Sequence, residues 1–161
     1  MNKRKQNGVA AVEMALIMTP ALLLCFGITE LGRALYQYDG LVKAARGGVR
    51  YLSQQSLASP PPGEDAASLR LKAKSLVVCG DFDCSGKTPL VPGLTLAMIS
   101  VCDPVGCAST HANVPTGEGT VSVVSVTVGT ASPFNFTSIM PWAVKSLAFG
   151  PVSISMASSA N

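Results

Sequence analysis

The sequence predicts an α+β protein in which a long N-terminal helix, transmembrane and then amphipathic, packs on a small antiparallel sheet with one further short helix. Three observations indicate this. Residues 9–28 are apolar, and apolar residues then recur at helical spacing to about residue 54. A shorter helical pattern covers residues 65–77. Short runs of alternating apolar and polar residues follow, which is typical of strands.

The composition narrows the class of protein. Hydrophobic residues make up 48% of the 161 residues and charged residues only 13%, against about 25% charged in ordinary soluble proteins. The net charge of +3 comes from Lys3, Arg4 and Lys5, since the chain without residues 1–8 carries nine basic and nine acidic residues. This balance argues against a disordered tail, a coiled-coil rod and a basic nucleic-acid binder. The length suits one domain.

The apolar run Val9–Ile28 is long enough to cross a bilayer, because twenty helical residues reach about 30 Å. The basic cluster just before it predicts a cytoplasmic N-terminus, with the rest of the chain on the other side. A cleaved secretory signal would need a small-x-small site, and none follows Phe26. A lipoprotein signal would need a small residue before Cys25, where Leu24 stands. A plain membrane anchor remains an alternative, but it explains neither Gly8 nor Glu13.

Glu13 is the charged residue within this run. A charge at the centre of a membrane helix costs roughly 3 kcal/mol, and such residues are usually functional. Cleavage between Gly8 and Val9 would create a cation nearby, the α-amino group of Val9. We therefore expect Glu13 of one molecule to neutralise the Val9 amine of the next. The alternative is an interfacial glutamate without a role, since a side chain near the helix end can reach the headgroups.

The short basic leader, Gly8, the segment from Val9 to Glu13 and the apolar helix together resemble a type IV prepilin. The residues that follow are similar to the TadE-like minor pseudopilins of Tad/Flp pilus systems. The residues that carry this second resemblance are Pro20, Gly27, Glu30, Gly32, Arg33, Ala34, Leu35, Tyr36, Ala44, Ala45, Arg46, Gly47, Gly48, Val49, Arg50 and Tyr51. The resemblance spans about residues 8–52. Met14 departs from it, because the family usually carries Phe there.

The resemblance implies a structural protein and not an enzyme. A prepilin peptidase would cut after Gly8, and Glu13 would guide assembly with other pilins and pseudopilins through the N-terminal helix. Further partners would be membrane lipid and, indirectly, the Tad assembly platform and its ATPase, with roles in adhesion or secretion. No cofactor and no nucleic acid is expected. The protein would cross the inner membrane once, with the N-terminus in the cytoplasm and the head in the periplasm or the pilus.

The helix is predicted to continue past the membrane to near Gln54. The apolar residues Leu31, Leu35, Tyr38, Val42, Ala45, Val49 and Leu52 form a heptad seam. This seam can pack on the protein's own sheet or on a partner. Gly47 and Gly48 indicate either a bend or the close approach of another backbone. Pro20 predicts a kink in the membrane half. Arg46 and Arg50 are expected to face solvent, with headgroup phosphates or a partner's carboxylate as the alternative.

The expected divisions are a cleaved leader at 1–8, a transmembrane helix at 9–28, a periplasmic helix extension at 29–58 and a head domain at 64–161. The Pro-rich stretch 59–63 ends the long helix. The expected strands of the head are Leu94–Cys102, Val121–Val128 with a bulge between Val123 and Val124, and Val152–Ala157. Trp142 is expected to be buried.

Four of the five cysteines lie in two pairs beyond the predicted membrane, Cys79 with Cys84 and Cys102 with Cys107. An oxidising compartment favours disulfides over a zinc site there. Four cysteines allow three connectivities. The local pairs are favoured because the turn after Cys102 can bring the chain back.

Other candidate sites in the head are weak. Asp81 and Asp83 resemble the opening of a calcium loop, but Pro92 stands where the twelfth ligand should be. His111 is expected on a surface loop, and no metal site is predicted. No motif of an enzyme family stands out. The alternative to a pseudopilin is an uncleaved single-pass anchor that carries a periplasmic binding module.

Overall fold

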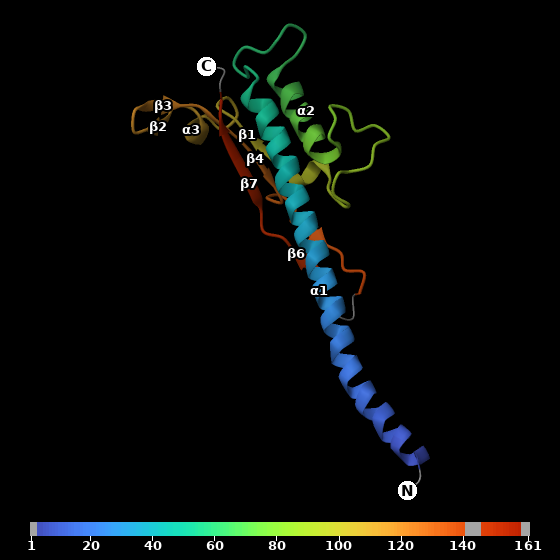
Figure 1. Ribbon diagram of the computed structural model, residues 1–161. Coiled ribbons are helices and arrows are strands. Elements are labelled where there is room, and N and C mark those ends of the chain that lie inside the picture. Colours follow the sequence, from blue (N-terminus) through green and yellow to red (C-terminus); the bar gives the residue numbers. More distant parts are fainter. Residues whose placement is uncertain (1–2, 141–145, 159–161) are drawn as a thin grey trace.

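The computed structural model describes residues 3–140 and 146–158, with side chains from residue 8 onward. One long helix, α1 (Lys3–Ser53), runs the length of the molecule, and the rest of the chain gathers around its C-terminal half (Figure 1). In its described residues the head contains two further α-helices, one 3-10 turn and seven strands. In chain order they are α2 (Ala66–Cys79), η1 (Leu96–Met98), β1 (Ile99–Cys102), α3 (Ala108–His111), β2 (Val114–Thr116), β3 (Gly119–Val121), β4 (Val123–Val128), β5 (Asn135–Phe136), β6 (Leu147–Ala148) and β7 (Val152–Ala157). The α+β prediction is confirmed. Trp142 lies outside the described residues.

The main sheet has the order β1-β4-β7, and both pairings are antiparallel. Helix α1 lies over β4 and β7, while α2 lies beside α1 and contacts β1. Val124, Val126 and Val128 of the central strand are buried, and they alternate along β4 because successive side chains point to opposite faces. The core therefore lies between two helices and one face of a three-stranded sheet.

Helix α2 has a sequence-specific signal at each end. The carboxylate of Asp65 accepts a hydrogen bond from the Ser68 N–H at 2.7 Å, and the Ser68 hydroxyl accepts one from the Asp65 N–H, which makes a capping box. At the other end Gly80 adopts a left-handed conformation with φ of 75° and donates its N–H to the Leu76 carbonyl. The sequence thus fixes both ends of the helix that packs beside α1.

Gly48 marks the contact between α1 and α2. A Cβ added there would lie 2.4 Å from Val77 Cγ2 and 3.2 Å from the Ala73 carbonyl oxygen. Of the two explanations for Gly47-Gly48, the close approach of another backbone is therefore the one that the structure shows. Helix α1 passes through both glycines without interruption.

The predicted heptad seam is confirmed at its C-terminal end and wrong at its N-terminal end. Ala45, Val49 and Leu52 are fully buried, but Leu31 and Leu35 are mostly exposed. The buried stripe of the N-terminal half of this segment lies one position away, at Glu30, Ala34 and Leu41. The reason is that the main sheet and α2 both cover the C-terminal half of α1, whereas only a small hairpin reaches its middle (Figure 1).

Two other expectations need correction. The predicted strand Leu94–Cys102 begins only at Ile99, because residues 96–98 form the 3-10 turn η1. The predicted strand 121–128 is divided at Ser122 into β3 and β4. The bulge predicted between Val123 and Val124 is therefore misplaced by one residue. Helix α1 continues through Pro20, and Figure 1 shows a gentle bend in the N-terminal half of the helix, so the kink at Pro20 stays a prediction.

Candidate functional site

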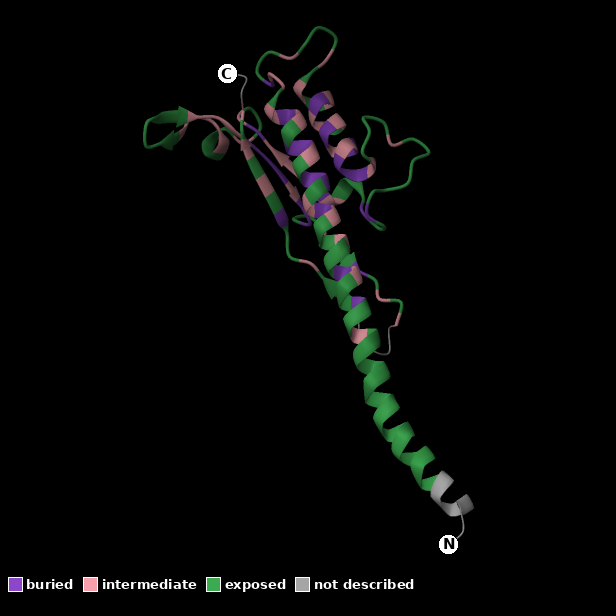
Figure 2. Cartoon of the chain, viewed as in Figure 1, coloured by how far each residue is buried: buried purple, intermediate pink, exposed green. Residues whose placement is uncertain are grey.

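No described part of the head packs against the N-terminal half of α1, which we call the bare half. Every residue from Gly8 to Phe26 is exposed, including Leu16 at 70%, and Figure 2 shows this half as a continuous exposed rod. In the described parts of the chain one helix is long and apolar enough to cross a membrane, and none of its most apolar stretch is buried. Each large apolar side chain left in water forfeits about 1.5–3 kcal/mol. This helix is consistent with a single-pass membrane protein.

Gly8, Val9 and Glu13 lie on this bare part of the helix. Among the residues whose side chains the structure describes, nothing lies within 4 Å of the position that a Cβ on Gly8 would take. Val9 and Glu13 are four residues apart and therefore lie on the same side of the helix. Both side chains are exposed. A neighbouring molecule would therefore meet the two groups together.

Glu30 is the first buried residue after the apolar run, at 2% exposure. Its two carboxylate oxygens accept hydrogen bonds from Nη1 of Arg33 at 2.9 and 3.1 Å. The Arg33 guanidinium lies over the ring of Phe136 in β5, 5.4 Å from its centroid. The pair therefore joins α1 to the β5–β6 hairpin. The resemblance marks Glu30 and Arg33 as family positions. The local sequence does not predict that Glu30 is buried, because Phe136, which packs on the pair, lies about a hundred residues further along the chain.

The remaining positions marked by the resemblance fall into two groups. Ala45 and Gly48 are buried in the core, and Tyr51 packs against Phe82 with ring centroids 5.1 Å apart. The second group, Gly32, Tyr36, Arg46 and Arg50, is exposed. Together with two exposed residues that the resemblance does not mark, Asp39 and Lys43, these residues recur every three or four positions along one face of α1, which we call the outer face. The expectation that the two arginines face solvent agrees with the structure.

Four of the six residues of the outer face are charged, namely Asp39, Lys43, Arg46 and Arg50. Tyr36 is 81% exposed, while Lys43 and Asp39 form an ion pair at 2.6 Å. The hydrogen bond that the Lys43 ammonium donates to the Asp39 carboxylate raises the pKa of Lys43 above its ordinary value. None of these residues contributes to the core, so this face is free to meet another molecule.

Both disulfides are local. Cys79 is bonded to Cys84 and Cys102 to Cys107, with S–S distances of 2.01 and 1.99 Å. This is the connectivity that the turn after Cys102 favoured. The thiolates that a zinc site would need are thus used in the two bridges. Among the described residues Cys25 is the free cysteine, and it is exposed on α1.

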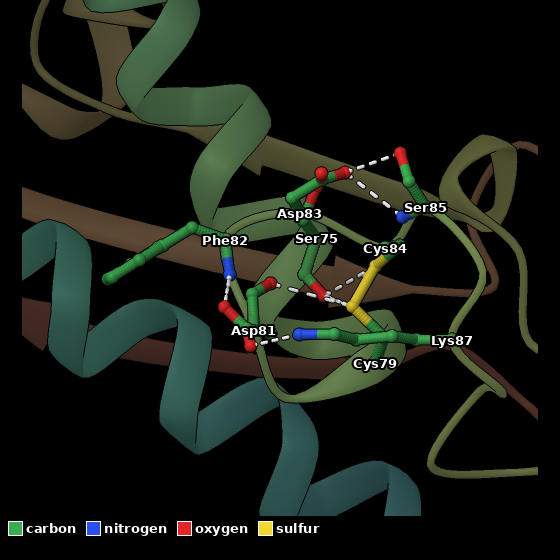
Figure 3. Close-up of polar contacts among 8 residues, drawn as sticks. All are labelled: Ser75, Cys79, Asp81, Phe82, Asp83, Cys84, Ser85 and Lys87. Carbon is green, nitrogen blue, oxygen red and sulfur yellow. Dashed lines mark hydrogen bonds and ion pairs between the residues drawn. A yellow bond between two sulfur atoms is a disulfide. The ribbon is translucent and has the colours of Figure 1, made fainter.

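The acidic loop after α2 is closed on itself, as Figure 3 shows. The Asp81 carboxylate pairs with the Lys87 ammonium and accepts a hydrogen bond from the Phe82 N–H at 2.7 Å. Asp83 accepts from both the N–H and the hydroxyl of Ser85. Lys87 lowers the pKa of Asp81, and the Ser85 hydrogen bonds lower that of Asp83. The carboxylates therefore stabilise the disulfide-closed turn.

The ion pair between Arg70 and Asp103 was not foreseen from the sequence. Asp103 is fully buried and binds Arg70 of α2 through both oxygens, at 2.5 and 3.0 Å. It also accepts hydrogen bonds from the N–H groups of Val105 and Gly106. Asp103 follows a cysteine of the second disulfide, so the loop and α2 are held together at this residue. The Asp-Pro pair indicated a turn but gave no sign of its partner.

His111 is not on a surface loop, as the sequence suggested, but at the end of α3. It is half-buried, and its Nε2 lies 2.7 Å from the Ser125 hydroxyl. The ligand atoms of Cys102, Cys107 and His111 lie within 4.8 Å of one another. The two sulfurs are bonded to each other, so in this oxidised state the three residues form a packed structural cluster.

Comparison with known families points to the same segment of α1. Residues 8–50 match the model of a family described as TadE-like protein. We call residues 8–50 the TadE-like segment, because the similarity lies in this part of the chain. The resemblance stated from the sequence is thereby confirmed over this segment, and the match supports involvement in a Tad pilus system. No curated protein and no solved structure matches the chain.

The TadE-like segment includes both the bare and the packed parts of α1. It begins at Gly8, crosses the apolar run and ends at Arg50, three residues before the helix does. The matched region therefore contains the Gly8–Val9 bond, Glu13, the Glu30–Arg33 pair and the outer face. The head beyond α1 lies outside the match.

Proposed function

We propose that this protein is a TadE-like minor pseudopilin that takes part in the assembly of a Flp-type pilus. In this proposal a prepilin peptidase cuts after Gly8, and the protein is stored in the inner membrane with its head on the periplasmic side. It acts as a structural subunit and not as an enzyme.

The observation that carries the proposal is the division of α1 into a bare apolar half and a packed half. An apolar helix without cover needs an apolar surrounding. Lipid provides this during storage, and the helices of other pilins provide it in an assembled fibre. The packed half holds the head in a fixed position relative to the bare half, because α1 is one uninterrupted helix.

Glu13 supplies the specificity of assembly in this mechanism. Cleavage after Gly8 exposes the α-amino group of Val9, which is cationic at neutral pH or slightly below it. In an apolar surrounding an isolated charge is costly, and pairing with an opposite charge removes much of that cost. A neighbouring Glu13 that reaches the amine therefore favours one axial position of the incoming helix over others.

Processing is tested by measuring the intact mass and N-terminal sequence of the membrane-extracted protein, with and without its prepilin peptidase. We expect a chain that begins at Val9 only when the peptidase is present, and Gly8→Leu to abolish this product. Retention of Met1 in both samples would support the alternative, an anchored binding module. A start beyond residue 28 would indicate a secreted protein.

Assembly is tested separately with Glu13→Ala. We expect this variant to be processed normally and to reduce piliation strongly, because the Val9 amine loses its partner. Glu118→Ala is the matched control, since Glu118 is an exposed glutamate of the head, next to β3. Normal pili with both Gly8→Leu and Glu13→Ala would contradict the mechanism.

The other partners follow from the pathway and not from a surface of this chain. The assembly ATPase and the membrane platform would act on the subunit indirectly, while other pilins would contact the N-terminal helix. A role in adhesion or secretion would be that of the pilus as a whole. Deleting the gene is expected to reduce surface adhesion only in cells that otherwise make pili.

A further inference from the structure

The β5–β6 hairpin lies at the end of the head that faces the bare half of α1 (Figure 1). Phe136 of β5 and Leu147 of β6 line a cavity of about 120 Å³ together with Gly27, Leu31 and Ala34 of α1. Gly27 still belongs to the apolar run that ends at Ile28. The hairpin is therefore level with the end of the segment assigned to the membrane.

Helix geometry fixes the depth of this hairpin if residues 9–28 span the hydrocarbon core. The headgroup region is about 5–7 Å thick on each side of the core. At 1.5 Å per helical residue, about four residues after Ile28 lie at headgroup depth. Glu30 falls at this level and Arg33 at its outer edge, and strands β5 and β6 beside them fall there too.

Several large apolar side chains are exposed near this level. Ile139, in the segment after β5, is 69% exposed, and Leu147 is 47% exposed. On α1, Ile28 and Leu31 are also exposed. We call these four residues the interfacial patch. Leu31 and Leu147 line the same cavity, and Ile139 follows the cavity residue Phe136 by three positions. Exposed apolar residues that gather at the end of an apolar span mark an interaction site.

We propose that the interfacial patch rests on the lipid surface and that the β5–β6 hairpin is a second membrane contact beside α1. The proposal rests on the membrane storage described above. Two contacts side by side restrict how far α1 slides along the bilayer normal and how far it tilts. The hairpin also keeps the Glu30 carboxylate away from lipid, since Arg33 and Phe136 cover it. This lipid contact does not depend on which side of the membrane the head occupies.

The test uses the full chain with Cys25→Ser, so that a single new cysteine can be labelled with an environment-sensitive fluorophore. Three variants are compared in vesicles of phosphatidylcholine and phosphatidylglycerol, namely Ile139→Cys, Leu16→Cys in the span and Leu71→Cys on α2. Leu71 is the matched control because it is 57% exposed but lies on the head's second helix. Quenching is measured with lipids that carry a nitroxide near the headgroup and with aqueous iodide.

We expect the nitroxide lipids to quench the Ile139 label about threefold more than the Leu71 label, as for a side chain buried 5–10 Å into the interface. Iodide should show the opposite order. If the Leu16 label is quenched by lipid but the Ile139 label behaves like that on Leu71, the second contact is wrong and membrane storage stands. If the Leu16 label is not quenched by lipid either, membrane storage fails and this inference fails with it.

Discussion

At the scale of single residues, Gly48 shows how a small side chain sets the distance between two helices. Ala normally stabilises a helix by about 1 kcal/mol relative to Gly. At Gly48 the new methyl group would lie 2.4 Å from Val77 Cγ2, and the backbone oxygen of Ala73 leaves little room for relief. We expect Gly48→Ala to destabilise the head by up to about 2 kcal/mol net, since overpacking costs about 1–3 kcal/mol and the helix gain offsets about 1 kcal/mol of it.

Gly32→Ala is the control for this substitution. Nothing lies within 4 Å of its Cβ position, so only the gain in helix propensity remains. Thermal unfolding in detergent, followed by circular dichroism, should therefore shift in opposite directions for the two variants. A shift of the same sign at both positions would mean that Gly48 does not set the helix spacing.

Asp103 predicts how stability depends on pH. Burial raises its pKa, but the Arg70 guanidinium and the N–H groups of Gly106 and Val105 together outweigh this and hold the pKa below its ordinary value. The carboxyl group therefore stabilises the fold above about pH 3.9, the ordinary value. That contribution is lost as the pH falls through the lower pKa of the folded state.

Asp103→Asn removes this contribution and leaves Arg70 without its anionic partner. We expect a loss of about 1.5–3 kcal/mol at neutral pH, the usual value of a hydrogen bond to a charged group. The loss should shrink as the pH falls below 4. Urea unfolding at pH 7 and pH 3 measures both values, and an equal loss at the two pH values would contradict this role of the carboxylate.

At the scale of elements, the two disulfides differ in what they support. Each closes a ring across a sequence separation of five residues, for which loop entropy predicts about 2 kcal/mol. The Cys102–Cys107 ring also positions Asp103 for Arg70, whereas the Cys79–Cys84 ring closes an exposed turn. We expect the double Ser variant of Cys102 and Cys107 to lower the unfolding temperature more than that of Cys79 and Cys84.

Unfolding of the two double variants under non-reducing conditions measures this difference. Mild reduction of the unmodified protein provides a further comparison, since it should lower the unfolding temperature at least as far as the Cys102/Cys107 variant does. Equal effects of the two double variants would mean that Asp103 is held without its ring.

The elements that sequence predicted well are those with a strong local signal. The end of α1 near Gln54, the helix after Asp65 and the strand at Val152 each have a turn, a cap or a clear period. Strands β5 and β6 have two residues each, which is too short for any period. Their position depends on contact with α1, so neither the hairpin nor the burial of Glu30 could be derived from local sequence. The seam at Leu31 and Leu35 failed for the same reason.

The site was predictable to a similar extent. Gly8, Val9 and Glu13 were marked by charge and apolar length alone, and these features need no tertiary structure. The division of the matched positions into a core group and the outer face needed the structure, because Gly48 and Arg46 lie only two residues apart on one helix. Which of them packs is decided by where α2 lies.

At the scale of the whole molecule, the bare half of α1 predicts that the head folds without it. Residues 8–25 are exposed along their whole length, so they contribute little to the core. We expect a chain that begins at Phe26 to remain soluble without detergent and to unfold within roughly 2 °C of the full chain, since such a shift corresponds to less than about 1 kcal/mol. A much lower unfolding temperature would show that the bare half stabilises the head.

The local pairing of the cysteines has a mechanical consequence. Neither bridge reaches α1, so the long helix is joined covalently to the rest of the head only through the chain that follows Ser53. A force along the axis of α1 therefore acts in shear on two sets of side-chain contacts. One set joins α1 to α2, and the other joins α1 to β4 and β7. Many contacts share such a load at once. Under tension the helix would slide out whole, leaving both disulfide rings closed.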